Sequence, residues 1–266
     1  MNTDAPSLED LQTMFEANPQ RFNVIEEPID MDLQINYLKR SKRLRKQQHS
    51  LEDVLAKLPL LYDEHTRLEE KRDIIIVLAG FDQVEAFRAL EAYKNVAQGD
   101  IKPYIALAYQ ESKIALESSL LGEKLTFISS GLGGKGTKLR FFICLFHVEQ
   151  KPYSAVQQKI LRDELSYVFS QHNAECESIE FSGSFAKISA LLPFTAEAHA
   201  LVGKVAQECN NQHDTFIEQD FILTNVHSLD DEEIEHYWKS RDFEDSFVDF
   251  DFSDFDFDDD DDDDEE

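Results

Sequence analysis

The stretch "FFICLFHVEQKPYSAVQQKILRDELSYVFSQH", residues 141–172, changes its apolar period halfway along. Its first part is a short apolar run rich in aromatic side chains, which is typical of a buried β-strand. From Ser154 onward, apolar and polar residues follow the spacing of an amphipathic helix. A strand followed closely by a helix predicts a mixed fold in which helices pack on a sheet.

The residues that follow extend this pattern. "CESIEFSG" and "SFAKISALLPF" predict a hairpin that turns at Ser182-Gly183-Ser184. Thr195 is expected to cap a second helix, "TAEAHALVGKVAQECN", before a last strand, "FILTNVHSL". The order from Phe141 is therefore β-α-β-β-α-β. It resembles the ferredoxin-like sandwich, which implies two helices on one face of a four-stranded antiparallel sheet. "TFISS", residues 126–130, is expected to add a strand at one edge.

Upstream of this region, helix-capping residues recur. The predicted caps are Ser50 before "LEDVLAKL", Thr66 before "RLEEKRDIIIVLA" and Asp82 before "QVEAFRALEAYKNVA". Another helix is expected over residues 101–121, ended by Gly122. The connections are short, so neighbouring helices should be antiparallel.

One part of this helical region carries a resemblance. "FDQVEAFRALEAYKNVAQGDIKPYIALAYQES", residues 81–112, resembles one HEAT-type helical repeat, with an Asp before each helix. It departs from that pattern at Pro103-Tyr104, where the family often has a Val-Arg pair. The resemblance implies a scaffolding surface for proteins or nucleic acids rather than catalysis.

These elements predict an α+β protein built from successive segments. A short helix is expected at residues 7–17. The expected segments are a weakly ordered region (1–49), a HEAT-like helical domain (50–122), a ferredoxin-like domain (123–229), a terminal helix (230–241) capped by Ser228, and a disordered tail (242–266).

Charge is distributed unevenly along the chain, whose net charge is -28. Residues 242–266 hold 16 of the 54 acidic residues and no basic one, which leaves a net charge of -12 for the rest. Such a polyanion repels nucleic acid and anionic membranes and attracts basic surfaces. Three widely spaced cysteines predict no disulfide framework, and no apolar run is long enough for a membrane span. We therefore expect a cytoplasmic protein that does not associate with membranes.

The glycine-rich stretch "SSGLGGKGTKLR" matches G-x-G-x-x-G literally. A strand, not a helix, is expected after it, so the dinucleotide-binding interpretation fails. The order Thr137-Lys138 also excludes a P-loop. We expect a flexible hairpin loop, either a mobile tip or a contact site for an anion or partner. Its candidate residues are Gly131, Gly133, Gly134, Lys135, Gly136, Lys138 and Arg140.

A basic segment, "LKRSKRLRKQQ", contrasts with the acidic chain. Its six cations would surround most of a helix, so a core helix is not expected. They could bind nucleic-acid phosphates or the chain's own acidic tail, or simply be solvated. The candidates are Lys39, Arg40, Lys42, Arg43, Arg45 and Lys46.

The sequence gives little support for metal binding or catalysis. His172, Cys176, Cys209 and His213 form two Cys/His pairs of equal spacing that could meet as zinc ligands, although buried cysteines and helix-end histidines are the simpler interpretation. No catalytic motif is found, and His147 is interpreted as a residue at the edge of the core. We predict no catalytic residue, no resident metal and no cofactor.

The tail "DFEDSFVDFDFSDFDFDDDDDDDEE" interleaves aromatic and acidic residues. Repulsion between the acids would keep the rings extended and available to a partner's basic, apolar pocket. A similar composition closes single-stranded-DNA-binding proteins, whose tails recruit partners. The alternative is a simple solubility tail. The candidate anchors are Phe243, Phe247, Phe250, Phe252, Phe255 and Phe257.

Three functions follow from these features. The first is a non-enzymatic adaptor or regulatory protein whose tail binds a basic protein. The second is a ribosome- or nucleic-acid-associated factor that uses the basic segment and the glycine-rich loop, with the tail controlling access. The third, and least supported, is an enzyme acting on a phosphorylated ligand at residues 131–140. The sequence leaves the oligomeric state open.

Overall fold

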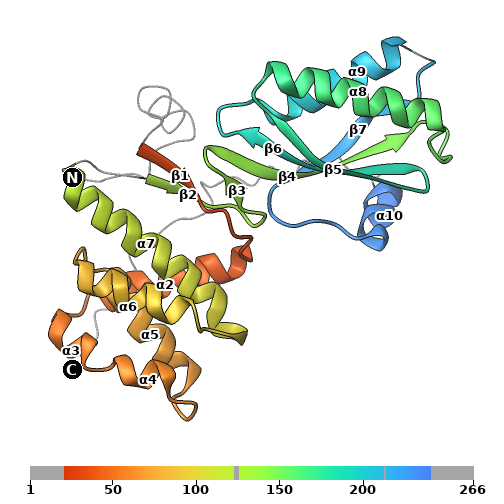
Figure 1. Ribbon diagram of the computed structural model, residues 1–266. Helices are drawn as coiled ribbons and strands as arrows, with labels where there is room; N and C mark the ends of the chain where they lie inside the picture. The colour runs from red at the N-terminus through yellow and green to blue at the C-terminus, as the bar shows by residue number, and fades with distance from the viewer. Residues whose placement is uncertain (1–20, 123–125, 213, 241–266) are drawn as a thin grey trace, which may run out of the picture. The chain divides into compact units, whose positions relative to one another are not determined.

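The computed structural model describes residues 21–122, 126–212 and 214–240, and shows a mixed fold of helices and a curled antiparallel sheet (Figure 1). The chain divides into two compact units, Met1–Ser228 and Leu229–Glu266. The helix expected at 7–17 lies outside the described residues. No helix within the described ranges is both long and apolar enough to cross a membrane.

The helical part of the first unit has one apolar core. Its elements are α2 (Met31–Arg45), α3 (Leu51–Leu55), α4 (Leu58–Tyr62), α5 (Leu68–Ala79), α6 (Val84–Lys94), the 3-10 helix η2 (Gly99–Ile101) and α7 (Lys102–Leu121). Ile75, Leu90 and Ile105 are fully buried in this core. The helix expected over 101–121 is confirmed, and Gly122 ends it in the left-handed conformation with φ +65°.

Of the three caps predicted at Ser50, Thr66 and Asp82, one is confirmed and two are wrong. Ser50 caps α3 as expected, because its hydroxyl accepts the backbone N–H of Asp53 at 3.1 Å. The caps predicted at Thr66 and Asp82 are wrong. Helix α5 begins after Arg67 and α6 after Gln83, in both cases without a side-chain cap.

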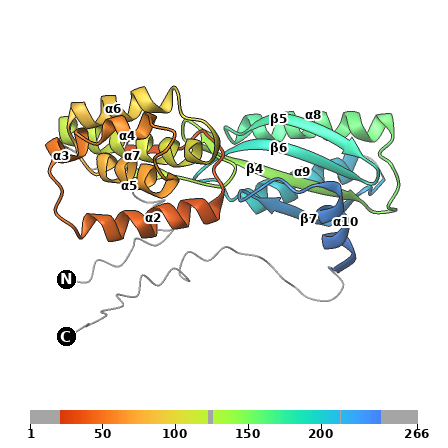
Figure 2. The same cartoon turned by 90° about the horizontal axis from the view of Figure 1, so that it is seen from below.

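The basic segment differs most from its expected structure. Residues 31–45, predicted to be weakly ordered, form the 15-residue helix α2, which Asp30 caps by accepting the N–H of Leu33 at 3.0 Å. Figure 2 shows α2 at the edge of the helical group. It was not expected to be a core helix, and the structure shows an amphipathic one, which buries one face and places Tyr37 and Leu44 in the core cluster.

The main sheet is built from β4 (Lys138–His147), β5 (Glu175–Ser182), β6 (Phe185–Pro193) and β7 (Ile217–Thr224). These four strands lie in the order β5-β6-β4-β7, and each pair of neighbours is antiparallel. The short strand β3 (Gly134–Lys135) pairs with the start of β4. Figure 1 shows α8 (Ala155–Gln171) and α9 (Ala198–Gln212) on the same face. The predicted order β-α-β-β-α-β is confirmed, although β7 begins four residues before the predicted strand.

One predicted strand lies outside the main sheet, although it was expected to form one of its edges. Within "TFISS", β2 (Thr126–Ile128) pairs in parallel with β1 (Phe22–Val24) in a separate two-stranded sheet. The edge prediction is therefore wrong, and Ile25 continues the contact with β2 by donating to the carbonyl of Ile128 at 3.0 Å.

The second unit contributes one described helix, α10 (Asp231–Ser240). The cap predicted at Ser228 is wrong. Asp230 and Glu233 form reciprocal bonds instead, in which each carboxylate accepts the other residue's backbone N–H, at 2.8 and 2.9 Å. This capping box lies two residues further along than expected.

Candidate anion-binding surface

Helix α2 buries one narrow face. Gln34, Tyr37, Ser41 and Leu44 are buried, and their spacing of three or four residues places them on one side of the helix. The Tyr37 hydroxyl donates to the carboxylate of Glu111 on α7 at 2.5 Å. Burial is the largest cause that raises the pKa of Tyr37 well above its ordinary value, so the phenol remains a donor.

Two of the six predicted cations flank this buried face and bind acids on neighbouring helices. Arg40 donates to Asp73 at 2.6 Å and also pairs with Glu69, both on α5. Arg45 pairs with Glu111 on α7. These arginines hold α2 against its neighbours, so their charges are largely compensated within the protein.

The other four cations lie on the opposite, solvent-exposed face. Lys39, Lys42, Arg43 and Lys46 follow the spacing i, i+3, i+4, i+7 and are all exposed. At 1.5 Å per residue the stripe is about 10 Å long. It can attract an anion, although cations in a last turn also stabilise the helix through its dipole. We call these four residues the α2 stripe.

The glycine-rich segment is packed rather than open. Gly131, Gly133 and Gly134 are buried. A Cβ on Gly131 would lie 1.7 Å from the carbonyl oxygen of Val226, and one on Gly133 would lie 2.4 Å from that of Glu26. The glycines therefore let the chain pass between two other backbone segments, which differs from the predicted flexible loop.

The cations of this segment are also engaged. Lys138 pairs with Glu175 on β5 at 2.5 Å. Arg140 donates two bonds to Glu177, at 2.6 and 2.9 Å, and a third to the carbonyl of Leu132 at 2.9 Å. The Arg140 guanidinium lowers the pKa of the Glu177 carboxyl. Only Lys135 and Gly136 in the predicted set are exposed, so the segment does not present a cluster of available cations.

The four candidate zinc ligands do not come together among the described residues. Cys209 is fully buried in the apolar core, whereas Cys176 is exposed on β5. The Nδ1 of His172 lies 2.8 Å from the carbonyl oxygen of Val168. His213 lies outside the described residues. Across the described ranges, no three His, Cys, Asp or Glu side chains form a possible metal site.

The remaining residues singled out by the sequence are His147, interpreted as a residue at the edge of the core, and the phenylalanines of the tail. His147 is buried, and its Nδ1 accepts the N–H of Glu149 at 3.1 Å, as expected for a residue of the core. The six phenylalanines, Phe243, Phe247, Phe250, Phe252, Phe255 and Phe257, lie outside the described residues.

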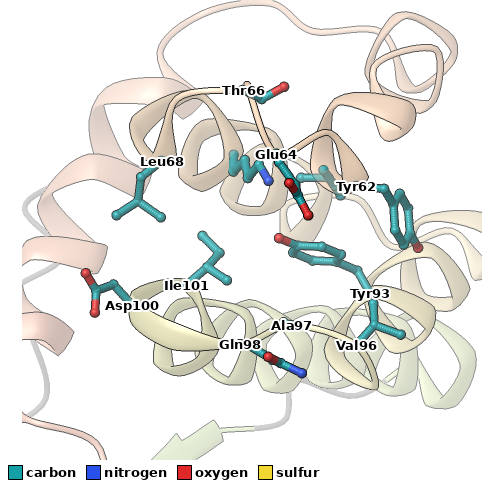
Figure 3. Close-up of a pocket in the computed structure, with 12 residues that line it drawn as sticks. Tyr62, Glu64, Thr66, Leu68, Tyr93, Val96, Ala97, Gln98, Asp100 and Ile101 are labelled. Carbon is teal, nitrogen blue, oxygen red and sulfur yellow. The ribbon is translucent and has the colours of Figure 1, made fainter.

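One surface feature is not indicated by any sequence motif. A groove of about 480 Å³ opens between α4, the turn that follows it, and the end of α6 (Figure 3). Exposed Tyr62 and Val96 flank it, and Tyr93 forms part of its wall. Its residues come from separate segments, so no local pattern marks it. A scan against protein-family models and a search of curated proteins each find no match for this chain.

Proposed function

We propose that this is a non-enzymatic adaptor or regulatory protein of the cytoplasm that binds a basic protein through residues 242–266. The observation that carries the proposal is the tail's composition, which has six phenylalanines among 16 acidic residues and no basic residue. Exposed aromatic residues do not improve solubility, whereas they are strong anchors at protein interfaces. The surrounding carboxylates select a partner with a basic rim.

In this proposal the folded part is a scaffold, with a HEAT-like helical domain at 50–122 and a ferredoxin-like domain at 123–229. The strand order β5-β6-β4-β7, with α8 and α9 on one face, supports the second assignment. The succession of helices joined by short connections supports the first. The ion pairs of Lys138 and Arg140 argue against a phosphate site in the glycine-rich segment.

Changing the six tail phenylalanines to serine is expected to weaken partner capture at least about tenfold, because each buried aromatic anchor contributes more than ~1 kcal/mol. The measurement is a quantitative pull-down with the full-length chain. A chain with the same six residues changed to leucine keeps apolar anchors and should retain much of the binding. Full capture by the serine variant, with an unchanged melting temperature, would contradict the proposal.

A second candidate, a ribosome- or nucleic-acid-associated factor, is favoured by the α2 stripe. Lys39, Lys42, Arg43 and Lys46 place four exposed cations within two helical turns. Single-stranded nucleic acid carries a regular series of phosphates that such a row can contact. The net charge of -28 opposes this association at long range, so we rank it below the adaptor.

Changing the four residues of the α2 stripe to alanine is expected to lower affinity for mixed-sequence single-stranded RNA about tenfold at about 50 mM salt. The slope of log K against log salt should become shallower by about 0.7 for each phosphate that the variant no longer neutralises. Fluorescence anisotropy measures both. A control removes three lysines and one arginine that are also exposed but lie far apart in the sequence, namely Lys57, Arg88, Lys102 and Lys159. Equal reductions in affinity for the two variants would leave this candidate without support.

A further inference from the structure

The groove beside α4 combines an apolar floor with exposed apolar walls. Leu61 and Ile101 are buried beneath it, while Tyr62 and Val96 at its sides are each 55% exposed. Both side chains line the same groove. A partner that covers them removes apolar surface from water, which favours binding. The groove's volume of about 480 Å³ is sufficient for several side chains.

Two tyrosines form an aromatic corner at one side of the groove. The rings of Tyr62 and Tyr93 meet edge to face, with centroids 5.4 Å apart and an interplanar angle of 81°. Tyr93 is 4% exposed, and its hydroxyl points into the groove (Figure 3). Burial raises the pKa of Tyr93, so this hydroxyl stays protonated. Aromatic faces attract cations as well as apolar groups.

The charges around the groove favour a cationic partner. Glu64 and Asp100 are exposed lining residues, and the Glu64 carboxylate points toward the tyrosine corner (Figure 3). Lys71 is the cation in the lining, and it is half-buried. An acidic segment would therefore meet two exposed carboxylates, and a second copy of this acidic chain would be repelled in the same way.

We propose that this groove binds a peptide segment of a basic protein, with an apolar side chain between Tyr62 and Val96, one lysine or arginine beside Glu64 and a second beside Asp100 at the other end of the groove (Figure 3). The partner class rests on the proposed adaptor function, but the site is separate from the tail. The folded helices and the tail then offer two contacts to one partner, which raises the overall affinity through effective concentration.

The test uses a fluorescein-labelled peptide of about 12 residues that repeats Leu-Lys-Lys, and a second that repeats Leu-Glu-Glu. Both are titrated at about 150 mM salt into the full-length chain whose six tail phenylalanines are serine, so that tail anchoring is removed. In this background, Tyr62→Ala with Val96→Ala should weaken binding of the lysine peptide about tenfold. The matched control is Tyr167→Ala with Val156→Ala on α8, which removes the same residue types at 61% and 60% exposure and should change binding less than about twofold.

Glu64→Gln with Asp100→Asn supplies a second test that leaves the apolar walls intact. It should weaken the lysine peptide about threefold and reduce the salt dependence of binding. Equal binding of the glutamate peptide, or equal effects of the groove and control pairs, would overturn the proposal. Self-association of the chain that Tyr62→Ala abolishes would assign the groove to a second copy and would also overturn it. If partner capture survives deletion of residues 242–266 but is lost with Tyr62→Ala and Val96→Ala, the tail proposal alone is refuted.

Discussion

Gly131→Ala is expected to lower the free energy of unfolding by about 3 kcal/mol or more. The added Cβ would lie 1.7 Å from the carbonyl oxygen of Val226 and 2.6 Å from its carbonyl carbon, far inside any allowed contact. The neighbouring backbone has little freedom to retreat, because Leu132 donates to the carbonyl of Asn225 at 3.0 Å. Urea denaturation, followed by fluorescence and circular dichroism, measures the change.

Gly136→Ala is the matched control for that result. Gly136 has φ +62°, but its Cβ would meet no heavy atom within 4 Å. This variant should therefore be destabilised only by the ~1–2 kcal/mol of a left-handed non-glycine residue. Destabilisation at Gly131 no larger than at Gly136 would contradict the close packing of Gly131 against Val226, because Gly131 does not have a positive φ. In that case the flexible-loop interpretation of the segment would return.

Leu161→Ala is expected to lower the free energy of unfolding by about 3 kcal/mol, within the ~2–5 kcal/mol typical of buried leucines. Leu161 on α8 is fully buried in the core between the helices and the sheet. The change removes apolar contacts and leaves a cavity that the surrounding strands cannot fill completely. Leu90→Ala should have an effect of the same size in the core of the helical part, where that leucine is also fully buried.

Leu120→Ala is the control for both leucine variants, because Leu120 is 74% exposed on α7. Its effect on the free energy of unfolding should stay below about 0.5 kcal/mol. Denaturation midpoints of the three variants, measured under one set of conditions, test the assignment of the two cores. Destabilisation at Leu120 as large as at Leu161 would contradict it.

The elements that can be predicted from sequence are those whose signals are local. The reciprocal bonds of Ser154 and Gln157 at the start of α8 lie within four residues, as does the turn at Gly183. The order of strands and helices follows from the change of apolar period. The pairing of β2 with β1 could not be predicted, because it joins short segments about 100 residues apart whose registry depends on the rest of the fold.

The candidate site can be predicted only in part for the same reason. The basic segment is visible in the sequence, but the ion pairs of Arg40 and Arg45 depend on α5 and α7, which supply Asp73 and Glu111. The glycines are visible in the sequence, but their close neighbours Val226 and Glu26 lie 95 residues from Gly131 and 107 residues from Gly133. The groove cannot be predicted from a local pattern because its lining comes from two separate stretches, residues 61–71 and 93–101.

The most direct test of the proposed function compares what co-purifies with the full-length chain and with the chain lacking residues 242–266. Mass spectrometry quantifies the captured proteins, and ultraviolet absorbance reports nucleic acid. We predict that the captured basic proteins fall at least about tenfold when the tail is removed. Retention of the same proteins at the same level, or capture dominated by nucleic acid that survives removal of the tail, would contradict the proposed function.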